Sequence, residues 1–250
     1  MTKALPMFEL TNDTNVNGVN SVFASSRDLV SPNFLLPKEI VPNIRLKMDG
    51  RSLLEFIPEA TIPVVFFDPQ YRGVLDKLAY GNEGIKRGKR RCELLQMDED
   101  TIRDFVDGIN RALIPSGHLF LWIDKYHLCQ DFRQWFNGTQ LEVVDLITWD
   151  KGRMGMGYRT RRVSEYCVVL QKSPKRAKGV WRIHDIPDVW REKVGTKKHP
   201  HQKPTELQSR LISAVSNEGD FIVDPAAGSF SVMDSAMLRN RNFIGCDLEG

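Results

Sequence analysis

Val64-Val65-Phe66-Phe67-Asp68-Pro69-Gln70-Tyr71 is the stretch of the sequence that decides the fold. Its first four residues are β-branched or aromatic, a composition typical of a strand that is buried on both faces. Pro69 has no amide N–H, so the strand has to end at Asp68. The stretch therefore predicts a carboxylate and, three residues later, an aromatic ring at the carboxyl edge of a sheet, where open α/β folds bind their ligands.

Two interpretations of this turn stay open on the stretch alone. A rigid turn that offers one hydrogen-bond acceptor and one stacking surface suits a flat, amino-bearing ligand such as a nucleobase. The alternative is an ordinary strand-ending turn with a solvated aspartate. The rest of the chain has to decide between them.

Length and charge favour one large α/β domain with a basic region. The chain of 250 residues is long enough to bury a full core. The formal net charge is only +3, but residues 151–203 hold fifteen Lys and Arg against four Asp and Glu, a local balance of +11. Aromatic residues lie among these cations, so the region is either a solvated face or a surface that binds a polyanion.

Cysteine and histidine usage indicates a cytoplasmic protein without a metal site. The four cysteines are widely spread and form no Cys-x-x-Cys pair, which favours reduced thiols in or near the core. His199 and His201 have too few neighbouring ligands to indicate a metal centre. The first 21 residues lack the apolar segment of a signal peptide, and no run of eighteen apolar residues occurs, so neither secretion nor membrane insertion is expected.

The first half of the chain predicts an N-terminal arm followed by alternating strands and helices. Residues 1–43 are rich in Asn, Ser, Thr and Pro and form the expected arm. Patterning predicts strands at 44–48, 64–67 and 119–123, with helices at 51–56, 98–113 and 125–136. Strand-helix-strand order implies parallel strands joined by right-handed crossovers.

Residues 81–91 form a glycine-rich segment that cannot build a core. Two interpretations remain open for it, a plain surface loop or a loop that grips nucleic acid beside Asp68. The second interpretation rests on its five cations, Lys86, Arg87, Lys89, Arg90 and Arg91.

The second half of the chain repeats the α/β plan. Strands are expected at 141–149 and 165–171 as a hairpin-like pair at the sheet edge, and residues 172–198 as a small inserted lobe. A helix is expected at 205–215, with Pro204 near its start, where the missing N–H costs nothing. The remaining elements are a strand at 220–223, a helix at 230–239 and a strand at 242–246.

The turn Asp224-Pro225-Ala226-Ala227-Gly228-Ser229 has the character of a cofactor site. Small residues let backbone N–H groups approach a ligand, and Asp247 at the next strand tip is placed to hold two ribose hydroxyls. The dinucleotide fingerprint Gly-x-Gly-x-x-Gly is absent. A tight strand-helix turn without a ligand is the alternative, which explains Gly228 but not Asp247.

Three motifs together resemble those of a known family. Asp-Pro-Gln-Tyr after a strand, His-Pro-His-Gln-Lys-Pro at 199–204 before a helix, and Asp-Pro-Ala-Ala-Gly-Ser between strand and helix occur in the order found in permuted, β-group amino-group DNA methyltransferases. The family forms are Asp-Pro-Pro-Tyr, His-Pro-Thr-Gln-Lys-Pro and Asp-Pro-Phe-x-Gly-Ser-Gly. The resemblance covers residues 44–250, including Ile147–Gly152 and Val180–Ile183.

The resemblance implies a Rossmann-like, circularly permuted α/β fold with a seven-stranded methyltransferase sheet. Residues 44–171 would form its catalytic half, residues 199–250 its cofactor-binding half, and residues 172–198 a small target-recognition insertion. The chain stops after the Asp247 strand, so the strand at 44–48 is expected to fill the missing edge position beside it.

The activity that the resemblance implies is adenine-N6 methylation of DNA with S-adenosylmethionine as the methyl donor. Asp68 and the backbone carbonyl of Gln70 would accept the two amine hydrogens of a flipped-out base, Pro69 would fix the turn, and Tyr71 would stack on the base. The implied cofactor residues are Asp49, His199, Gln202, Lys203, Pro204, Asp224, Pro225, Ala226, Ala227, Gly228, Ser229 and Asp247. Contacts to DNA are expected from the five cations of residues 86–91 and from Arg159, Arg161 and Arg162.

Alternatives remain within and outside this activity. Asp rather than Ser at position 68 favours adenine over cytosine N4, and RNA is a further possible substrate. Gln70, Ala226 and Phe230 depart from the family motifs, which leaves a catalytically silent nucleic-acid-binding subunit as the rival from another class. The resemblance also implies a bacterial or phage-encoded protein acting on intracellular DNA, with a homodimer and a restriction endonuclease as candidate partners.

Overall fold

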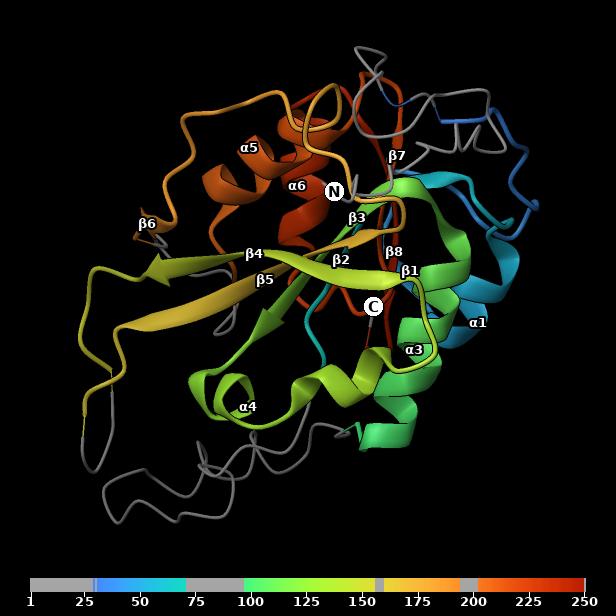
Figure 1. The fold of residues 1–250 in the computed structure, drawn as a ribbon. Helices are drawn as coiled ribbons and strands as arrows, with labels where there is room; N and C mark the ends of the chain where they lie inside the picture. Colours follow the sequence, from blue (N-terminus) through green and yellow to red (C-terminus); the bar gives the residue numbers. More distant parts are fainter. Residues whose placement is uncertain (1–28, 30, 71–96, 156–159, 194–201, 250) are drawn as a thin grey trace, which may run out of the picture.

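One eight-stranded sheet forms the middle layer of the molecule, and helices cover both of its faces (Figure 1). The computed structural model describes residues 29, 31–70, 97–155, 160–193 and 202–249. The strand order is β1-β8-β7-β2-β3-β5-β4-β6. The first five strands in this order run parallel, β5 is antiparallel to both β3 and β4, and β6 runs parallel to β4 at the edge.

The predicted strands are present, with one addition. The strands are β1 (Leu46–Lys47), β2 (Ile62–Phe67), β3 (Leu113–Ile123), β4 (Leu141–Asp150), β5 (Ser164–Lys172), β6 (Val189–Arg191), β7 (Phe221–Asp224) and β8 (Asn242–Asp247). β1 is shorter than expected, but it pairs with β8 and fills the predicted edge position. The three-residue strand β6 is the addition to the expected seven.

The helices also follow the sequence pattern, except for one. They are α1 (Gly50–Phe56), α3 (Glu99–Ala112), α4 (Lys125–Cys129), α5 (Thr205–Val215), α6 (Ser231–Met237) and the 3₁₀-helix η2 (Phe132–Phe136). The prediction of a continuous helix over 125–136 is wrong, because Gln130 is extended at ψ 171° and separates α4 from η2. The predicted 230–239 helix is shorter at both ends, since Phe230 lies in the left-handed region.

Strand β2 lies at the centre because both of its faces are buried. Val65 and Phe67 belong to the core cluster under α1 and α3, whereas Val64 and Phe66 belong to the cluster under α5 and α6. All six β2 residues are buried. Burying each large apolar side chain contributes about 1.5–3 kcal/mol, so the strand that carries Asp68 is firmly fixed.

Residues 173–193 lie against the body of the domain. Apart from β6 they have no regular structure, and they run past the α5 side of the sheet (Figure 1). The side chains that pack on the α5 and α6 cluster are those of Trp181, Ile183, Ile186 and Trp190. The recognition role expected of residues 172–198 stays a prediction.

Glu192 ties this segment to the start of α5. Pro204 occupies the N-cap position of α5 and makes no side-chain hydrogen bond there. The carboxylate of Glu192 accepts the N–H groups of Glu206 at 3.1 Å and Leu207 at 3.0 Å instead. A carboxylate at a helix N-terminus satisfies unpaired N–H groups and complements the helix dipole. The position of Lys203, just before this helix, is fixed as a result.

No helix in the described parts of the chain combines the length and apolar character that crossing a membrane requires. Of the cysteines described, Cys167 and Cys246 are buried and Cys129 is exposed.

Candidate active site

Four aspartates follow four neighbouring parallel strands at one edge of the sheet. Val65 of β2 is paired with Val223 of β7, and Asp224 at the end of β7 is paired with Gly245 of β8. Asp68 directly follows β2, and Asp247, paired with Lys47 of β1, ends β8. Asp49 comes two residues after β1. The tips at Asp68 and Asp224 therefore lie side by side at this edge.

Strand alternation turns the functional side chains to the α5 side. Asp68 has the same parity as Phe66, which packs in the α5 and α6 cluster, and Trp122 of β3 belongs to that cluster as well. Glu165 of β5 has the parity of Cys167 in the same cluster. Lys203 reaches these groups from the chain that enters α5.

Asp68 is paired with a buried lysine. The ammonium of Lys203 lies 2.8 Å from Oδ2 of Asp68 and 3.1 Å from Oε2 of Glu165. It also lies 5.3 Å from the centre of the Trp122 ring, which adds a cation–π contact. The side chain of Lys203 is 13% exposed and that of Asp68 is 29% exposed. Lys203 was expected near the carboxylate of a cofactor, and the structure pairs it with Asp68.

Glu165 and Lys151 extend this pair into a row of alternating charges. Lys151 contacts Oε1 of Glu165 and lies 5.2 Å from the centre of the Trp149 ring. The row therefore runs Asp68, Lys203, Glu165, Lys151, with two negative and two positive groups. Sequence reasoning missed Glu165 and Lys151. A single acid at the start of an apolar strand was the signal, but its partner Lys203 is 38 residues away.

The pKa values of the row follow from burial and pairing. Burial raises the pKa of Asp68 above its ordinary value, and the Lys203 ammonium opposes that shift. Burial also opposes ionisation of Glu165, but Lys203 and Lys151 outweigh it and lower the pKa of Glu165 to about 2. Although burial disfavours the charge of Lys203, Asp68 and Glu165 hold its pKa above the ordinary value. Pairing thus outweighs burial at Glu165 and Lys203, whereas burial outweighs pairing at Asp68.

Asp224 lies in a different environment. It is 5% exposed, and its carboxylate accepts the N–H of Ala226 at 3.2 Å. Within the described ranges it makes no ion pair. Burial, together with the negative charges of Asp68 and Asp247, raises the pKa of Asp224 to about 8 against the opposing effects of the Ala226 N–H and the Lys203 ammonium. The free protein therefore binds a proton at this carboxyl group more tightly than a solvated aspartate does.

The turn after Asp224 is held by close backbone contacts. Ala227 donates its N–H to the carbonyl of Cys246 at 2.9 Å. A Cβ atom on Gly50 would come within 2.0 Å of the Pro225 carbonyl oxygen, so only glycine lets α1 approach the turn. Gly228 has φ +47° and open space where a Cβ would lie. The turn is therefore rigid at its base and open at Gly228.

Phe230 closes the turn in a conformation that suits glycine. Its φ is 58° and its ψ 30°, and its side chain is fully buried against the ring of Phe243 at 6.2 Å between centroids. The family form has glycine at this place. The left-handed conformation costs a non-glycine residue about 1–2 kcal/mol, which here is offset by burial of the ring.

The other described site residues lie around the same edge. Asp49 caps α1 by accepting the N–H of Arg51 at 2.8 Å. Gln202 has a buried Oε1 that makes no hydrogen bond with any described residue. Asp247 accepts the N–H of Glu249 at 2.9 Å. No role in cofactor binding follows from these contacts alone, so the assignments stay predictions.

The Gln70 carbonyl already takes part in one hydrogen bond. It accepts the N–H of Met97 at 2.7 Å. A carbonyl oxygen has two lone pairs, so this group can accept a second hydrogen bond besides that from Met97, as its expected role requires.

Of the residues expected to contact DNA, only Arg161 and Arg162 lie within the described ranges. Arg161 is exposed and Arg162 is half-buried, at the chain reversal between β4 and β5. Neither is shown to contact DNA. The predicted residues outside the described ranges are Tyr71, Lys86, Arg87, Lys89, Arg90, Arg91, Arg159 and His199.

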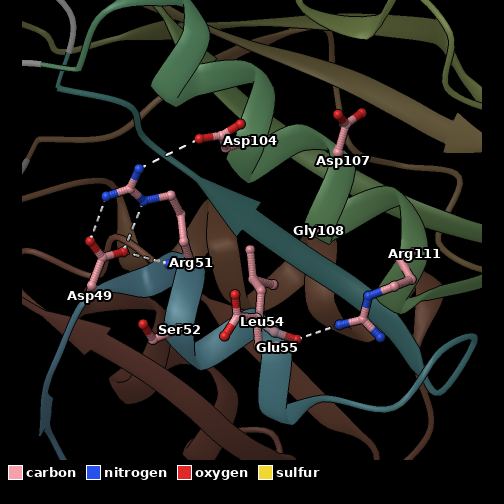
Figure 2. A pocket seen from close by; sticks show the side chains of 9 residues that line it. All are labelled: Asp49, Arg51, Ser52, Leu54, Glu55, Asp104, Asp107, Gly108 and Arg111. Carbon is pink, nitrogen blue, oxygen red and sulfur yellow. Dashed lines mark hydrogen bonds and ion pairs between the residues drawn. The ribbon is translucent and has the colours of Figure 1, made fainter.

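A separate pocket of about 420 Å³ lies between α1 and α3 (Figure 2). Arg51 crosses it and pairs with Asp49 at 2.9 Å and with Asp104 at 3.5 Å. Figure 2 shows Arg111 reaching from α3 toward the backbone of α1. Asp68 and Asp224 do not line this pocket, whereas Asp49, which follows β1 at the edge of strand tips, does.

Comparisons with known proteins agree with this geometry. A match to the DNA methylase family covers residues 64–250. The chain is similar to the Type II methyltransferase M.HhaII of Haemophilus parahaemolyticus, with 54% identity over 207 residues, which are 82% of this chain and 91% of the relative.

Solved structures share the fold at low sequence identity. The PvuII DNA methyltransferase, described as cytosine-N4-specific, aligns with a TM-score of 0.66 at 15% identity and covers 86% of both chains. The M1.HpyAVI–SAM complex aligns with a TM-score of 0.58 at 16% identity, over 80% of this chain and 90% of that one. Because the family match and the likeness to M.HhaII span most of the chain, the protein is a DNA methyltransferase of the N6/N4 DNA methylase family.

Proposed function

We propose that this DNA methyltransferase transfers a methyl group from S-adenosylmethionine to the N6 amine of a flipped-out adenine. The observation that carries the proposal is the adjacency of the β2 and β7 tips. Asp68 and Asp224 follow paired parallel strands, so a base amine at the first lies next to a methyl donor at the second. The identity with M.HhaII over most of the chain supports the same reaction class.

The residues around Asp224 fit a cationic nucleotide cofactor. A buried carboxyl group without an ion pair in the described chain matches the positive methionine end of S-adenosylmethionine. The unpaired Oε1 of Gln202 offers a further acceptor, and Gly228 leaves open space beside the turn. Asp247 at the neighbouring tip would hold the ribose hydroxyls, and Asp49 would lie near the adenine.

Within this proposal, the protein positions the amine and the bound cofactor supplies the activated methyl group. An exocyclic amine is a poor nucleophile, because its lone pair is delocalised into the ring. Asp68 accepts one N–H and the free lone pair of the Gln70 carbonyl accepts the other, which aims the nitrogen lone pair at the methyl carbon. Tyr71 stacks on the base and offsets part of the cost of extruding it, by about 1–3 kcal/mol.

A labelled-methyl assay tests the reaction. Purified protein with labelled S-adenosylmethionine and unmethylated genomic DNA should yield N6-methyladenine on nucleoside analysis. Asp68→Ala should abolish transfer while DNA binding survives. Product on cytosine N4, or none from a folded protein that still binds DNA, would contradict the proposal in favour of the cytosine or the silent-subunit alternative.

Charge-changing variants test the DNA surface. Neutralising Lys86, Arg87, Lys89, Arg90 and Arg91 should weaken DNA binding and flatten its salt dependence, because each phosphate contact releases a counterion. Neutralising Arg159, Arg161 and Arg162 should do the same to a smaller extent. An unchanged salt slope would remove the affected residues from the interface.

The biological setting is part of the proposal. We propose that the enzyme acts on DNA inside a bacterial cell or for a phage, together with a restriction endonuclease. The Type II name of M.HhaII supports this setting. Sequencing DNA from cells that express the protein would reveal the methylated site, and light scattering would test the expected homodimer.

A further inference from the structure

We propose that Glu165 is a positioning residue for the methyl-transfer step, because it fixes the Lys203 ammonium on one oxygen of Asp68 and so leaves the other oxygen directed at the target amine. This inference rests on the proposed function. It concerns a residue outside all three sequence motifs.

The contacts of Lys203 define what Glu165 can do. The ammonium bridges Asp68 Oδ2 at 2.8 Å and Glu165 Oε2 at 3.1 Å. Oδ1 of Asp68 makes no hydrogen bond with any residue in the described ranges. A lysine side chain has a flexible four-carbon stem, so its ammonium keeps one position only when several partners fix it. Glu165 and the Trp122 ring supply the second and third of these partners.

Glu165 is itself held from the far side. Lys151 contacts its other oxygen and lies over the Trp149 ring, whose indole N–H donates to the Glu192 carbonyl at 2.9 Å. Glu192 in turn caps α5, the helix that Lys203 precedes. Both ends of the Glu165–Lys203 pair are therefore anchored to the same rigid frame, and small displacements at Glu165 reach Asp68.

The negative charge of Glu165 and the Lys203 ammonium that it holds have opposite effects on the pKa of Asp68. The groups that face Asp68 are Lys203 before α5, Glu165 and Cys167 on β5, Lys151 after β4, and Asp224 on β7. As a bare negative charge, Glu165 raises the pKa of Asp68, whereas the Lys203 ammonium that it holds lowers it. If Glu165 acts only as a negative charge, its loss lowers the pKa of Asp68. If Glu165 holds Lys203 in place, its loss raises that pKa.

The experiment compares Glu165→Gln with wild type in methylation of unmethylated genomic DNA. The variant should lower kcat about ten-fold or more, leave the Kd for S-adenosylmethionine and for DNA within about two-fold, and move the acid limb of the kcat–pH profile to higher pH. Glu165→Asp should restore part of the rate. A limb that moves to lower pH, or a normal kcat, would overturn the inference.

A matched control and a double variant separate positioning from stability. Glu142→Gln removes the partner of Lys175 on the neighbouring strand β4, at 2.7 Å and far from Asp68, and should leave kcat and its pH profile unchanged. In a Lys203→Met background, Glu165→Gln should cost little further activity, since the two act through one contact. Full additivity of the two losses would contradict the inference.

A second variant, Lys151→Met, tests the same anchoring of Glu165. If Glu165→Gln does not fold, Lys151→Met should give a milder fall in kcat with the same direction of pH shift. A folded Lys151→Met enzyme with a wild-type profile would then assign Glu165 a structural role. An inactive wild-type protein would refute the proposed function, whereas an active wild type with a normal Glu165→Gln variant would refute only this inference.

Discussion

The tips at Asp68 and Asp224 start with the same Asp-Pro dipeptide on adjacent parallel strands, yet their carboxyl groups have different surroundings. Asp68 has a lysine of its own at 2.8 Å. Asp224 is more deeply buried, accepts one N–H, and faces two other acids, so its pKa rises to about 8. Within the described ranges, Asp68 thus has a counter-ion and Asp224 has none. This difference supports the proposal that the first tip binds a neutral base and the second a cation.

The alanine variants of Asp68 and Asp224 have the largest expected effects, and the two variants should differ in which quantity changes. Asp68→Ala should lower kcat at least a hundred-fold and leave the Kd for S-adenosylmethionine nearly unchanged. Asp224→Ala should weaken cofactor binding by about ten- to a hundred-fold, because a hydrogen-bonded charge contributes about 1.5–3 kcal/mol. Single-turnover kinetics and calorimetry measure the two quantities. The same kinetic defect in both variants would break the comparison.

Cofactor binding should release a proton from Asp224. Below pH 8 the free carboxyl group is protonated, whereas a bound cation favours the carboxylate. The Kd should therefore fall by up to about ten-fold per pH unit as the pH rises from 6 to 8. Calorimetry in buffers of different ionisation enthalpy should show close to one proton released, and Asp224→Asn should release none.

Stability should depend on pH with opposite signs at Asp224 and Glu165. Between pH 4 and 8 the folded state binds the Asp224 proton more tightly than the unfolded state, so the free energy of unfolding should fall as pH rises, by up to about 1.4 kcal/mol per unit. Glu165, with its pKa lowered to about 2, contributes stability above pH 4.5 that is lost as pH falls toward 2.

Denaturant unfolding across this pH range measures both effects. Asp224→Asn should remove the decline between pH 4 and 8 and leave the acid limb intact. A decline that persists in this variant would show that Asp224 has an ordinary pKa.

The difference in stability between two variants of Phe230 is the smallest expected effect, and it tests how rigid the Asp224 turn is. Phe230→Ala should cost about 3–5 kcal/mol through loss of a buried ring. Phe230→Gly should be more stable than the alanine variant by about 1 kcal/mol, because glycine accepts φ 58° without strain. Thermal unfolding ranks the two variants, and the reverse order would mean that the residue leaves the left-handed region.

Local patterns were sufficient to predict the strands and their tips. The run Val64–Phe67 followed by Asp-Pro specifies both burial and termination, and Asp224-Pro225 ends its strand in the same way, whereas Asp247 follows an apolar strand without a proline after it. The edge place of β1 was expected only from the resemblance, which implies a seven-stranded sheet with one position left beside β8. The strands themselves could be predicted from neighbours in the sequence.

Contacts between distant residues could not be predicted in this way. Glu165 and Lys203 are 38 residues apart, and Glu192 caps a helix that starts after Pro204. Each residue alone reads as a solvated charge, and only the packing of β5, β4 and α5 reveals the network. The break at Gln130 was missed for a related reason, since Trp135 and Phe136 turn into the core and override the helical period.

The hydrogen bond from Met97 to the Gln70 carbonyl has a consequence for how such enzymes diversify. It joins Gln70, two residues after Asp68, to Met97, with 2.7 Å between the Met97 nitrogen and the Gln70 carbonyl oxygen. Once the ends of a chain segment are fixed, doubling its length costs only about 0.6 kcal/mol. The number of residues between Gln70 and Met97 can therefore change at little cost in free energy, while the strand that carries Asp68 keeps its place.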